Sequence, residues 1–280
     1  MMGIRNKPLV VIKIGGDVLQ DKHERLGLAS NVKDLHNLGW DIIILHGGGP
    51  QVNELQKHHG LTPLKIAGRR VTSKKDLQVV KQAIAGEVNV DLVSLLTASG
   101  LPAFGCHGAS GLLIEASKRP PVMITGQGDK LIDFGEVGDV LSINEKLLFG
   151  LLDLGQIPVI ATLGMSNDGR IFNINADTTV VQIAKSVKAN LLLLITQIGG
   201  IYKDIADSES LITDITPHQA KALIEKGIIQ DGMIPKVEEA IKLLDEGVET
   251  IAIAAARRLG IFQALASNEN SLKATRIRKD

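Results

Sequence analysis

Two clusters of glycine follow short apolar runs and could bind an anion through the backbone. Residues 15–16 follow the run "PLVVIKI" (8–14), and residues 47–49 follow the run "DIIILH" (41–46). A glycine turn that leads from a strand into a helix exposes backbone N–H groups at the positive end of the helix dipole. Two such turns on strands of one sheet favour an anion site over two merely tight turns.

The pattern excludes the best-known nucleotide-binding loops. The dinucleotide fingerprint needs a glycine where Val52 stands, and the sequence has no Gly-Lys-Ser/Thr triplet of the Walker type. The signatures of protein kinases are also missing. The sequence therefore predicts a phosphate site of another kind.

Two lysines stand where a positive charge is unusual. Lys13 lies inside an apolar run, two residues before the first glycine pair, although a lysine on an exposed strand face explains it more simply when it is taken alone. Pro235 suits the first position of a helix, which places Lys236 in the first turn, where a cation opposes the helix dipole. An anion between Lys236 and the helix end would reverse the sign of that effect.

Other polar residues have both a structural and a functional interpretation. Asp177 precedes a helical pattern and is a natural N-cap. Arg69 and Arg70 are either solvated turn charges or contribute one carboxylate clamp, since a guanidinium can bind a carboxylate through two parallel hydrogen bonds. The seven histidines show no metal-ligand spacing, and His46 is interpreted as support for the backbone.

The elements that must position these residues alternate along the chain. Continuous apolar strands alternate with amphipathic helices, which predicts an α/β fold with a mainly parallel sheet covered on both faces. The stretch 104–144 is rich in Gly and Pro and is predicted to form antiparallel strands and loops, and 167–175 to form a hairpin that turns at Asp168-Gly169. Further strands are expected at 101–106, 157–162, 190–196, 250–255 and, at the sheet edge, 271–278, and helices at 74–99, 145–155, 177–189, 216–227 and 235–247.

Composition limits the classes of function. Lys+Arg and Asp+Glu both total 31, which argues against a general nucleic-acid or anionic-membrane surface. Cys106 is the only cysteine, so the chain has no intramolecular disulfide and no thiolate metal cluster. No apolar stretch reaches the roughly 20 residues of a membrane span, and the first residues lack the features of a signal peptide. We therefore expect a cytoplasmic protein.

Six stretches, taken together and in this order, resemble the amino acid kinase superfamily and, within it, the members that act on N-acetylglutamate. They are "VIKIGGDVL", "ILHGGGPQVNELQ", "GRRVT", "FGEVGDV" with "IN", "NINAD" and "DGMIPKVEEA". The resemblance implies a three-layer α/β/α fold with two lobes: residues 1–168 bind the acyl amino acid and form a dimer, and residues 169–280 bind the nucleotide. It also implies ATP- and Mg²⁺-dependent phosphorylation of the γ-carboxylate of N-acetyl-L-glutamate in arginine biosynthesis, with Mg²⁺ held mainly by the nucleotide phosphates.

The resemblance implies a role for individual residues. Lys13 and Lys236 match two lysines that stabilise the transition state, and Asp177 matches the carboxylate that orients them. The residues that match acyl-substrate contacts are Gly48, Gly49, Arg70 and Asn173. The residues that match nucleotide-lining positions are Gly15, Gly16, Thr196, Gln197, Gly199, Gly200, Ile201, Tyr202, Ile228, Ile229 and Gln230.

This inventory fits the chemistry of carboxylate phosphorylation. A carboxylate nucleophile is already ionised at neutral pH, so no general base is needed. Phosphoryl transfer depends mostly on positioning and on stabilisation of charge, which fixed N–H groups, lysines and a metal ion supply.

Alternatives remain open at this stage. A non-catalytic sensor of the same fold is one, and kinases for acetylaminoadipate, glutamate, aspartate or carbamate are others. The intact lysines and Asp177 argue against a sensor, and the pair "RVT" and "NINAD" favours acetylglutamate. Gln197 departs from the family pattern, where Asp is frequent, and Ser110 stands where Asp-Gly is usual.

The ends of the chain lead to one more expectation. Arginine-inhibited members of the family carry an N-terminal helix that links dimers into hexamers, and here only "MMGIRNK" precedes Pro8. The segments "AIAAARR" and "KATRIRKD" also depart from the pattern of the effector region. We therefore expect a homodimer that free arginine does not inhibit.

Overall fold

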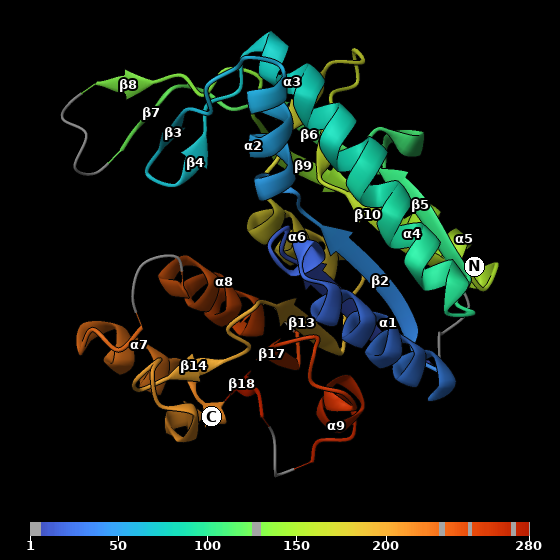
Figure 1. The fold of residues 1–280 in the computed structure, drawn as a ribbon, viewed down its shortest axis with the longest axis vertical. Coiled ribbons are helices and arrows are strands. Elements are labelled where there is room, and N and C mark those ends of the chain that lie inside the picture. The colour runs from blue at the N-terminus through green and yellow to red at the C-terminus, as the bar shows by residue number, and fades with distance from the viewer. Residues whose placement is uncertain (1–6, 125–129, 230–232, 246–247, 270–272, 280) are drawn as a thin grey trace.

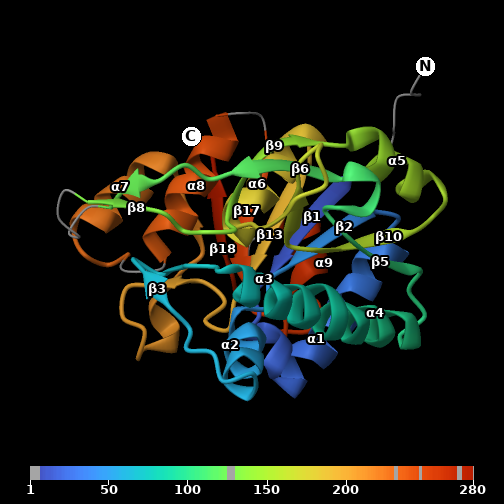
Figure 2. The ribbon, with the colours of Figure 1, turned by 90° about the horizontal axis from the view of Figure 1, so that it is seen from above.

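A computed structural model describes residues 7–124, 130–229, 233–245, 248–269 and 273–279. Its centre is an eight-stranded sheet in the order β16-β18-β17-β13-β1-β2-β10-β5 (Figures 1 and 2). All neighbouring strands pair in parallel except β17 and β18. The bounds are β1 (Leu9–Ile14), β2 (Asp41–His46), β5 (Ala103–His107), β10 (Ile157–Ala161), β13 (Leu191–Ile195), β16 (Asp214–Ile215), β17 (Thr250–Ala254) and β18 (Thr275–Arg278).

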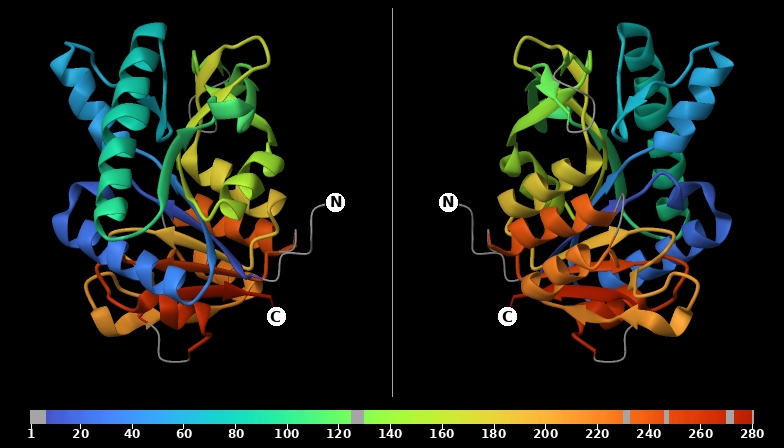
Figure 3. Two further views of the ribbon diagram at one scale, coloured as in Figure 1. Left: turned by 90° about the vertical axis from the view of Figure 1, so that its right-hand side faces the viewer. Right: turned by 90° about the vertical axis from the view of Figure 1, so that its left-hand side faces the viewer.

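Helices cover both faces of this sheet, which confirms the three-layer α/β/α prediction (Figure 3). One face packs against α1 (Lys22–Asn37), α4 (Asn89–Ala98) and α9 (Ile261–Ala266). The other packs against α5 (Glu145–Asp153), α6 (Ala176–Ser186), α7 (Pro217–Glu225) and α8 (Met233–Asp245). None of the described helices is long and apolar enough to cross a bilayer.

The alternation of side chains along β1 decides where Lys13 lies. Val10, Ile12 and Ile14 join the core under α1 and α9, whereas Leu9 and Val11 join the core under α6 and α8. Successive strand residues point to opposite faces, so Lys13 lies on the face of α6 and α8. It is 7% exposed, so the simpler interpretation of an exposed surface lysine is wrong.

A second, smaller sheet has the order β12-β11-β6-β9 and confirms the irregular, mostly antiparallel middle of the chain. Its strands are β6 (Ile114–Lys118), β9 (Gly138–Ile143), β11 (Leu163–Met165) and β12 (Ile171–Asn173). Two hairpins project at the same end of the molecule, β3–β4 (Lys65–Ile66, Arg69–Arg70) and β7–β8 (Val122–Met123, Leu131–Ile132) (Figure 1). A third pair is β14–β15 (Ile201–Tyr202, Leu211–Ile212).

The helix predicted at 74–99 is present but has a widened middle. It consists of α3 (Lys74–Val80), a π-helical segment (Lys81–Val88) and α4. Ser73 and Asp76 form a capping box at its start. A π-helical turn within an α-helix often marks a functional site. Here it places Ile84 beside the second glycine turn, where a Cβ added to Gly48 would meet Ile84 Cγ1 at 3.1 Å.

The structure corrects one expectation about the sheet edge. The last strand, β18, lies between β17 and β16 instead of at the edge. Its Arg276 is 1% exposed and pairs with Asp214 of β16 through two bonds of 3.0 and 3.1 Å, so this short strand covers it.

Candidate active site

The two predicted glycine turns lie side by side at the carboxyl ends of β1 and β2, where Ile14 pairs with His46. They pack against each other, since a Cβ on Gly16 would lie 2.9 Å from both Gly48 Cα and Pro50 Cδ. The second turn leads directly into α2 (Gly49–His58), and Gln51 of that helix donates to the Gly16 carbonyl at 2.8 Å. The absence of side chains therefore allows the two turns to form one continuous surface of backbone.

His46 supports the second turn from below, as the sequence suggested. Its Nδ1 lies 2.9 Å from the Gly47 carbonyl, and its Nε2 lies 2.9 Å from Asn89 Nδ2, which also donates to the Val159 carbonyl. An amide nitrogen only donates, so Nε2 accepts and Nδ1 carries the proton that bonds to Gly47. Complete burial lowers the pKa of His46 to about 4.

This buried histidine makes stability depend on pH. The pKa of His46 is about 4 in the folded protein and 6.5 in the reference state, so the unfolded chain binds more protons between these values. We expect the free energy of unfolding to fall by up to about 3 kcal/mol as the pH drops from 6.5 to 4. Urea denaturation over this range measures it. His46→Gln should flatten the dependence, and an equal slope in both proteins would contradict the assignment.

Lys13 and Asp177 form an ion pair, with Nζ and Oδ1 2.8 Å apart. The expectation that Asp177 caps α6 is wrong, because Asn175 is the N-cap and accepts from Thr178 N. Asp177 instead lies in the first turn, where the helix dipole stabilises a carboxylate. Its side chain is 31% exposed and so keeps contact with the solvent-accessible space around Lys13.

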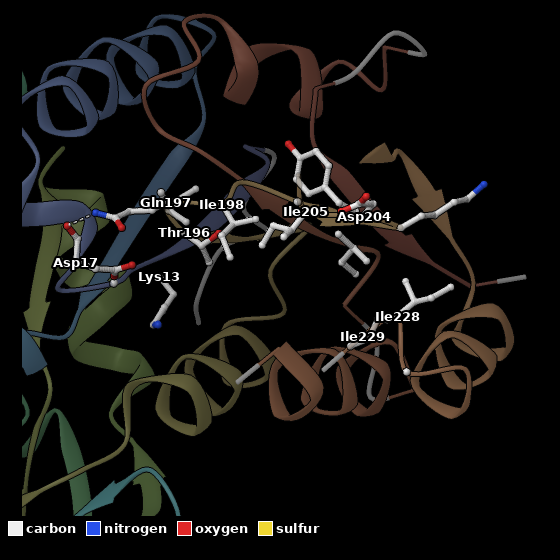
Figure 4. Close-up of a pocket in the computed structure, with 16 residues that line it drawn as sticks. Lys13, Asp17, Thr196, Gln197, Ile198, Asp204, Ile205, Ile228 and Ile229 are labelled. Carbon is white, nitrogen blue, oxygen red and sulfur yellow. Dashed lines mark hydrogen bonds between the residues drawn. The ribbon is translucent and has the colours of Figure 1, made fainter. Parts of the chain in front are cut away.

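A cavity of about 860 Å³ adjoins Lys13 and the C-terminal part of the sheet (Figure 4). Lys13 and Asp17 lie at one end of it, and Ile228 and Ile229 lie toward the other. The predicted nucleotide residues that line it are Gly15, Thr196, Gln197, Gly200, Ile201, Tyr202, Ile228 and Ile229. Ile198, which lies within the predicted nucleotide segment 197–202, also lines it. Lining residues that the sequence interpretation missed are Asp17, Ile195, Lys203, Asp204, Ile205 and Gly227.

Two of the predicted nucleotide residues, Gly16 and Gly199, do not line this cavity, and a third lies outside the described residues. Gly16 packs under the second glycine turn, and Gly199 packs on Ala255, whose Cβ would lie 2.5 Å from an added Cβ. Gly199 also has a φ of +76° and bonds through its N–H to Thr196 Oγ1 at 3.0 Å, so it forms the turn that shapes the wall. Gln230 lies outside the described residues.

Gln197, the residue that departs from the family pattern, joins the two strand ends. Its side-chain Nε2 donates to the Asp17 carbonyl at 3.1 Å. Its own carbonyl accepts from Arg257 at 2.6 Å, and Arg257 pairs with the buried Glu24 at the start of α1. The loop at the cavity mouth is therefore tied to α1 by this chain of contacts.

A second cavity, of about 170 Å³, lies beside the other glycine turn. It is lined by all four predicted acyl-substrate residues, Gly48, Gly49, Arg70 and Asn173. It is also lined by two arginines without an assigned role, Arg69 and Arg119, of which Arg119 pairs with Asp139. No Asp or Glu is among its described lining residues. This lining suits a ligand with more than one carboxylate.

The two cavities approach each other at the Lys13–Asp177 pair. Lys13 lines the larger cavity, and Ala176, the neighbour of Asp177, lines the smaller one. Pro235 is the third residue of α8 instead of the first, which a helix tolerates because its first four N–H groups have no intrahelical partner. Lys236 follows it in the first turn, and its side chain lies outside the described residues.

Other reactive groups are scarce in the described part of the chain. Burial raises the pKa of the Cys106 thiol to about 12, so it stays protonated and is a poor nucleophile. No group of three or more His, Cys, Asp and Glu among the described residues could hold a metal ion.

Known proteins of similar sequence and structure point in one direction. The Amino acid kinase family model matches residues 8–255. Acetylglutamate kinase of Anaeromyxobacter dehalogenans is 40% identical over 247 residues, which cover 87% of this chain and 90% of that protein. Acetylglutamate kinase of Methanopyrus kandleri is 41% identical over 243 residues, which cover 87% and 93% of the two chains.

A solved structure agrees over nearly the whole chain. The smu.665 protein from Streptococcus mutans UA159 superposes with a TM-score of 0.75 and 30% sequence identity, and the match covers 97% of this chain and 99% of that one. Together with the family match over residues 8–255, this agreement leads to one conclusion: the chain belongs to the amino acid kinase family.

Proposed function

We propose that this chain transfers the γ-phosphoryl group of ATP to the γ-carboxylate of N-acetyl-L-glutamate, giving N-acetylglutamyl 5-phosphate and ADP in arginine biosynthesis. Relatives named acetylglutamate kinase at about 40% identity along most of the chain support the substrate. The observation that carries the proposal is the position of a buried lysine between two neighbouring cavities, because a phosphoryl group must pass between two bound substrates. Lys13 lines the larger cavity and pairs with Asp177, whose neighbour Ala176 lines the smaller one.

Each cavity suits one substrate. The larger has a volume of about 860 Å³ and pairs apolar walls at Ile198, Ile205 and Ile228 with the cation Lys13, which suits a nucleotide base and its phosphates. The smaller is lined by Arg70 and Asn173 together with the turn at Gly48 and Gly49, which suits an acyl amino acid with two carboxylates.

The residues of this chain act on charge and position. Lys13 would neutralise charge that develops on the transferring group, and Asp177 would hold its ammonium group in place at 2.8 Å. The backbone N–H groups of the glycine turns would add fixed donors without any reorganisation. Lys236 belongs to the same proposal by its place in the first turn of α8.

Mg²⁺ usually keeps several waters and binds one or two carboxylates together with substrate phosphates. Asp17 is the carboxylate that lines the larger cavity beside Lys13, and a single carboxylate suits an ion carried in by a nucleotide better than a resident ion (Figure 4). When bound, Mg²⁺ would neutralise phosphate charge.

A turnover assay tests the function. ATP, Mg²⁺ and the acyl substrate are incubated with hydroxylamine, which traps an acyl phosphate as a coloured hydroxamate. We expect turnover of N-acetyl-L-glutamate and much slower turnover of free glutamate, aspartate, carbamate and acetylaminoadipate. Equal or faster turnover of any of these would overturn the substrate assignment. Nucleotide binding without turnover of any of them would support a sensor instead.

We also propose that the chain forms a homodimer through the edge strand β5. Its outer edge has no strand partner in the part of the chain that the structure describes, and its Phe104 is 44% exposed. Val90 of α4 and Leu154, the residue that follows α5, are 61% and 75% exposed beside this edge. Light scattering should show a dimer for the native chain and a monomer for Phe104→Glu.

Insensitivity to arginine stays a prediction, and an activity titration with free arginine tests it.

A further inference from the structure

A completely buried glutamine, Gln56 of α2, lies behind the arginine of the acyl-substrate cavity. Its Oε1 accepts from Arg70 Nη1, and its Nε2 donates to Asp76 Oδ1 at 2.5 Å. These two charged neighbours determine which end of the amide faces each of them, since only the oxygen can accept from a guanidinium and only the nitrogen can donate to a carboxylate.

All described hydrogen-bond acceptors of Arg70 are neutral oxygens. Nη2 donates to the Gly49 carbonyl at 3.1 Å and to Asn53 Oδ1 at 2.6 Å, in addition to the bond from Nη1 to Gln56. The nearby carboxylate, Asp76, is separated from the guanidinium by the length of the Gln56 amide. Arg70 is thus held on several sides by contacts that do not cancel its charge.

The charges on either side of Gln56 are both present at neutral pH. Burial acts to raise the pKa of Asp76, but hydrogen bonds from Ser73 and Gln56 and the charge of Arg70 outweigh it, so the pKa lies below its usual value. Burial lowers the pKa of Arg70, and the charge of Asp76 opposes that change, but an arginine stays protonated in proteins.

We propose that Gln56 is a positioning residue that orients Arg70 through a neutral oxygen and keeps Asp76 apart from it, so that the charge of Arg70 is reserved for a carboxylate of the acyl substrate. This inference rests on the proposed function, because it assigns Arg70 to an anionic ligand in the smaller cavity. It goes beyond that function by naming a residue that controls how tightly Arg70 binds a carboxylate of the substrate.

The proposal distinguishes charge from shape. Gln56→Glu keeps the size of the side chain and its acceptor toward Arg70 but adds an anion that competes with the substrate. Gln56→Leu removes the acceptor without adding charge. If Gln56 only filled space and bonded Arg70, Gln56→Glu would weaken substrate binding less than Gln56→Leu. If Gln56 is needed as a neutral group between two charges, Gln56→Glu would weaken substrate binding more than Gln56→Leu.

We expect the KM for N-acetyl-L-glutamate to rise roughly tenfold or more in Gln56→Glu, because a new anion beside the guanidinium repels a dianionic ligand. In Gln56→Leu it should rise about 2–10-fold, the effect of one lost hydrogen bond. The KM for ATP should stay unchanged in both. Gln78→Glu, the same substitution on the exposed side of α3 near Asp76, is the matched control and should behave like the native chain.

The pH dependence of the KM separates the proposed role from a purely structural one. The charged groups bonded to position 56 are Asp76 from α3 and Arg70 from β4, and the charged residues nearest to it in sequence, Glu54 and Lys57, are exposed. A glutamate at 56 beside Asp76 should take up a proton at mildly acidic pH and become neutral. The KM ratio of Gln56→Glu to the native chain should therefore fall toward one between pH 7.5 and roughly 5.5.

Three results would overturn the inference: a Gln56→Glu KM equal to the native value, a milder effect for Gln56→Glu than for Gln56→Leu, or a KM ratio that does not change with pH. Circular dichroism confirms that each variant is folded, and calorimetric binding of N-acetyl-L-glutamate repeats the comparison without turnover. Failure of the proposed function is a separate outcome, because the native chain itself would then neither bind nor phosphorylate this substrate.

Discussion

Replacing Lys13 by alanine is expected to lower kcat about 10²–10³-fold, the usual effect of removing one group that stabilises charge in the transition state. Lys13 is buried, lines the larger cavity and pairs with Asp177, whose neighbour Ala176 lines the smaller one. No other described lysine lies on β1. The KM values should change less than kcat, because the ammonium group acts mainly on charge that develops during transfer. Steady-state kinetics, with each substrate varied in turn, measures kcat and both KM values.

The fold of this variant should persist. Asp177, which loses its ion pair with Lys13, is 31% exposed and can be hydrated. The double variant Lys13→Ala, Asp177→Asn should be little slower than Lys13→Ala alone, since residues that act as a unit are not additive. A folded Lys13→Ala protein with near-native kcat would remove Lys13 from the mechanism.

Replacing Arg70 by alanine is expected to raise the KM for N-acetyl-L-glutamate about 10–100-fold, because hydrogen bonds to charged groups contribute about 1.5–3 kcal/mol. The KM for ATP should stay near its native value, since Arg70 lines only the smaller of the two cavities. Lys65→Ala removes a cation from the strand that pairs with Arg70 in the β3–β4 hairpin and serves as the control. A rise confined to ATP, or a similar rise in the control, would contradict the assignment of Arg70.

The layered fold could be predicted from the pattern of apolar residues in the sequence. Strands such as β1 and β13 are continuous apolar runs, and the helices between them show one apolar face, so their type and order follow from periodicity. Both glycine turns were predicted at the ends of strands of one sheet, and the structure places them on two strands that pair with each other. The π-helical middle of the helix at 74–98 was not predictable, because one widened turn hardly changes the spacing of apolar residues.

The supporting residues of the site were harder to predict than its central ones. Lys13 and the glycines stand out because their types conflict with their neighbours. Gln56 and Asp76 do not, because a polar residue on an amphipathic helix is ordinary until the helix is packed. Their contact spans 20 positions in sequence and depends on how α2 lies against α3. Such a contact is a property of tertiary packing, which local patterns do not encode.

The continuous central sheet limits how the two substrates can be brought together. β1, which carries Lys13, is bonded on one side to β2, whose glycine turn lines the smaller cavity. On the other side it is bonded to β13, which leads into the larger cavity. No hinge can separate these parts without breaking a ladder of backbone hydrogen bonds. A relative movement of the two substrates is therefore expected to require a change in the twist of the sheet. The part of the sheet that carries Lys13 is therefore expected to be among the most rigid parts of the molecule.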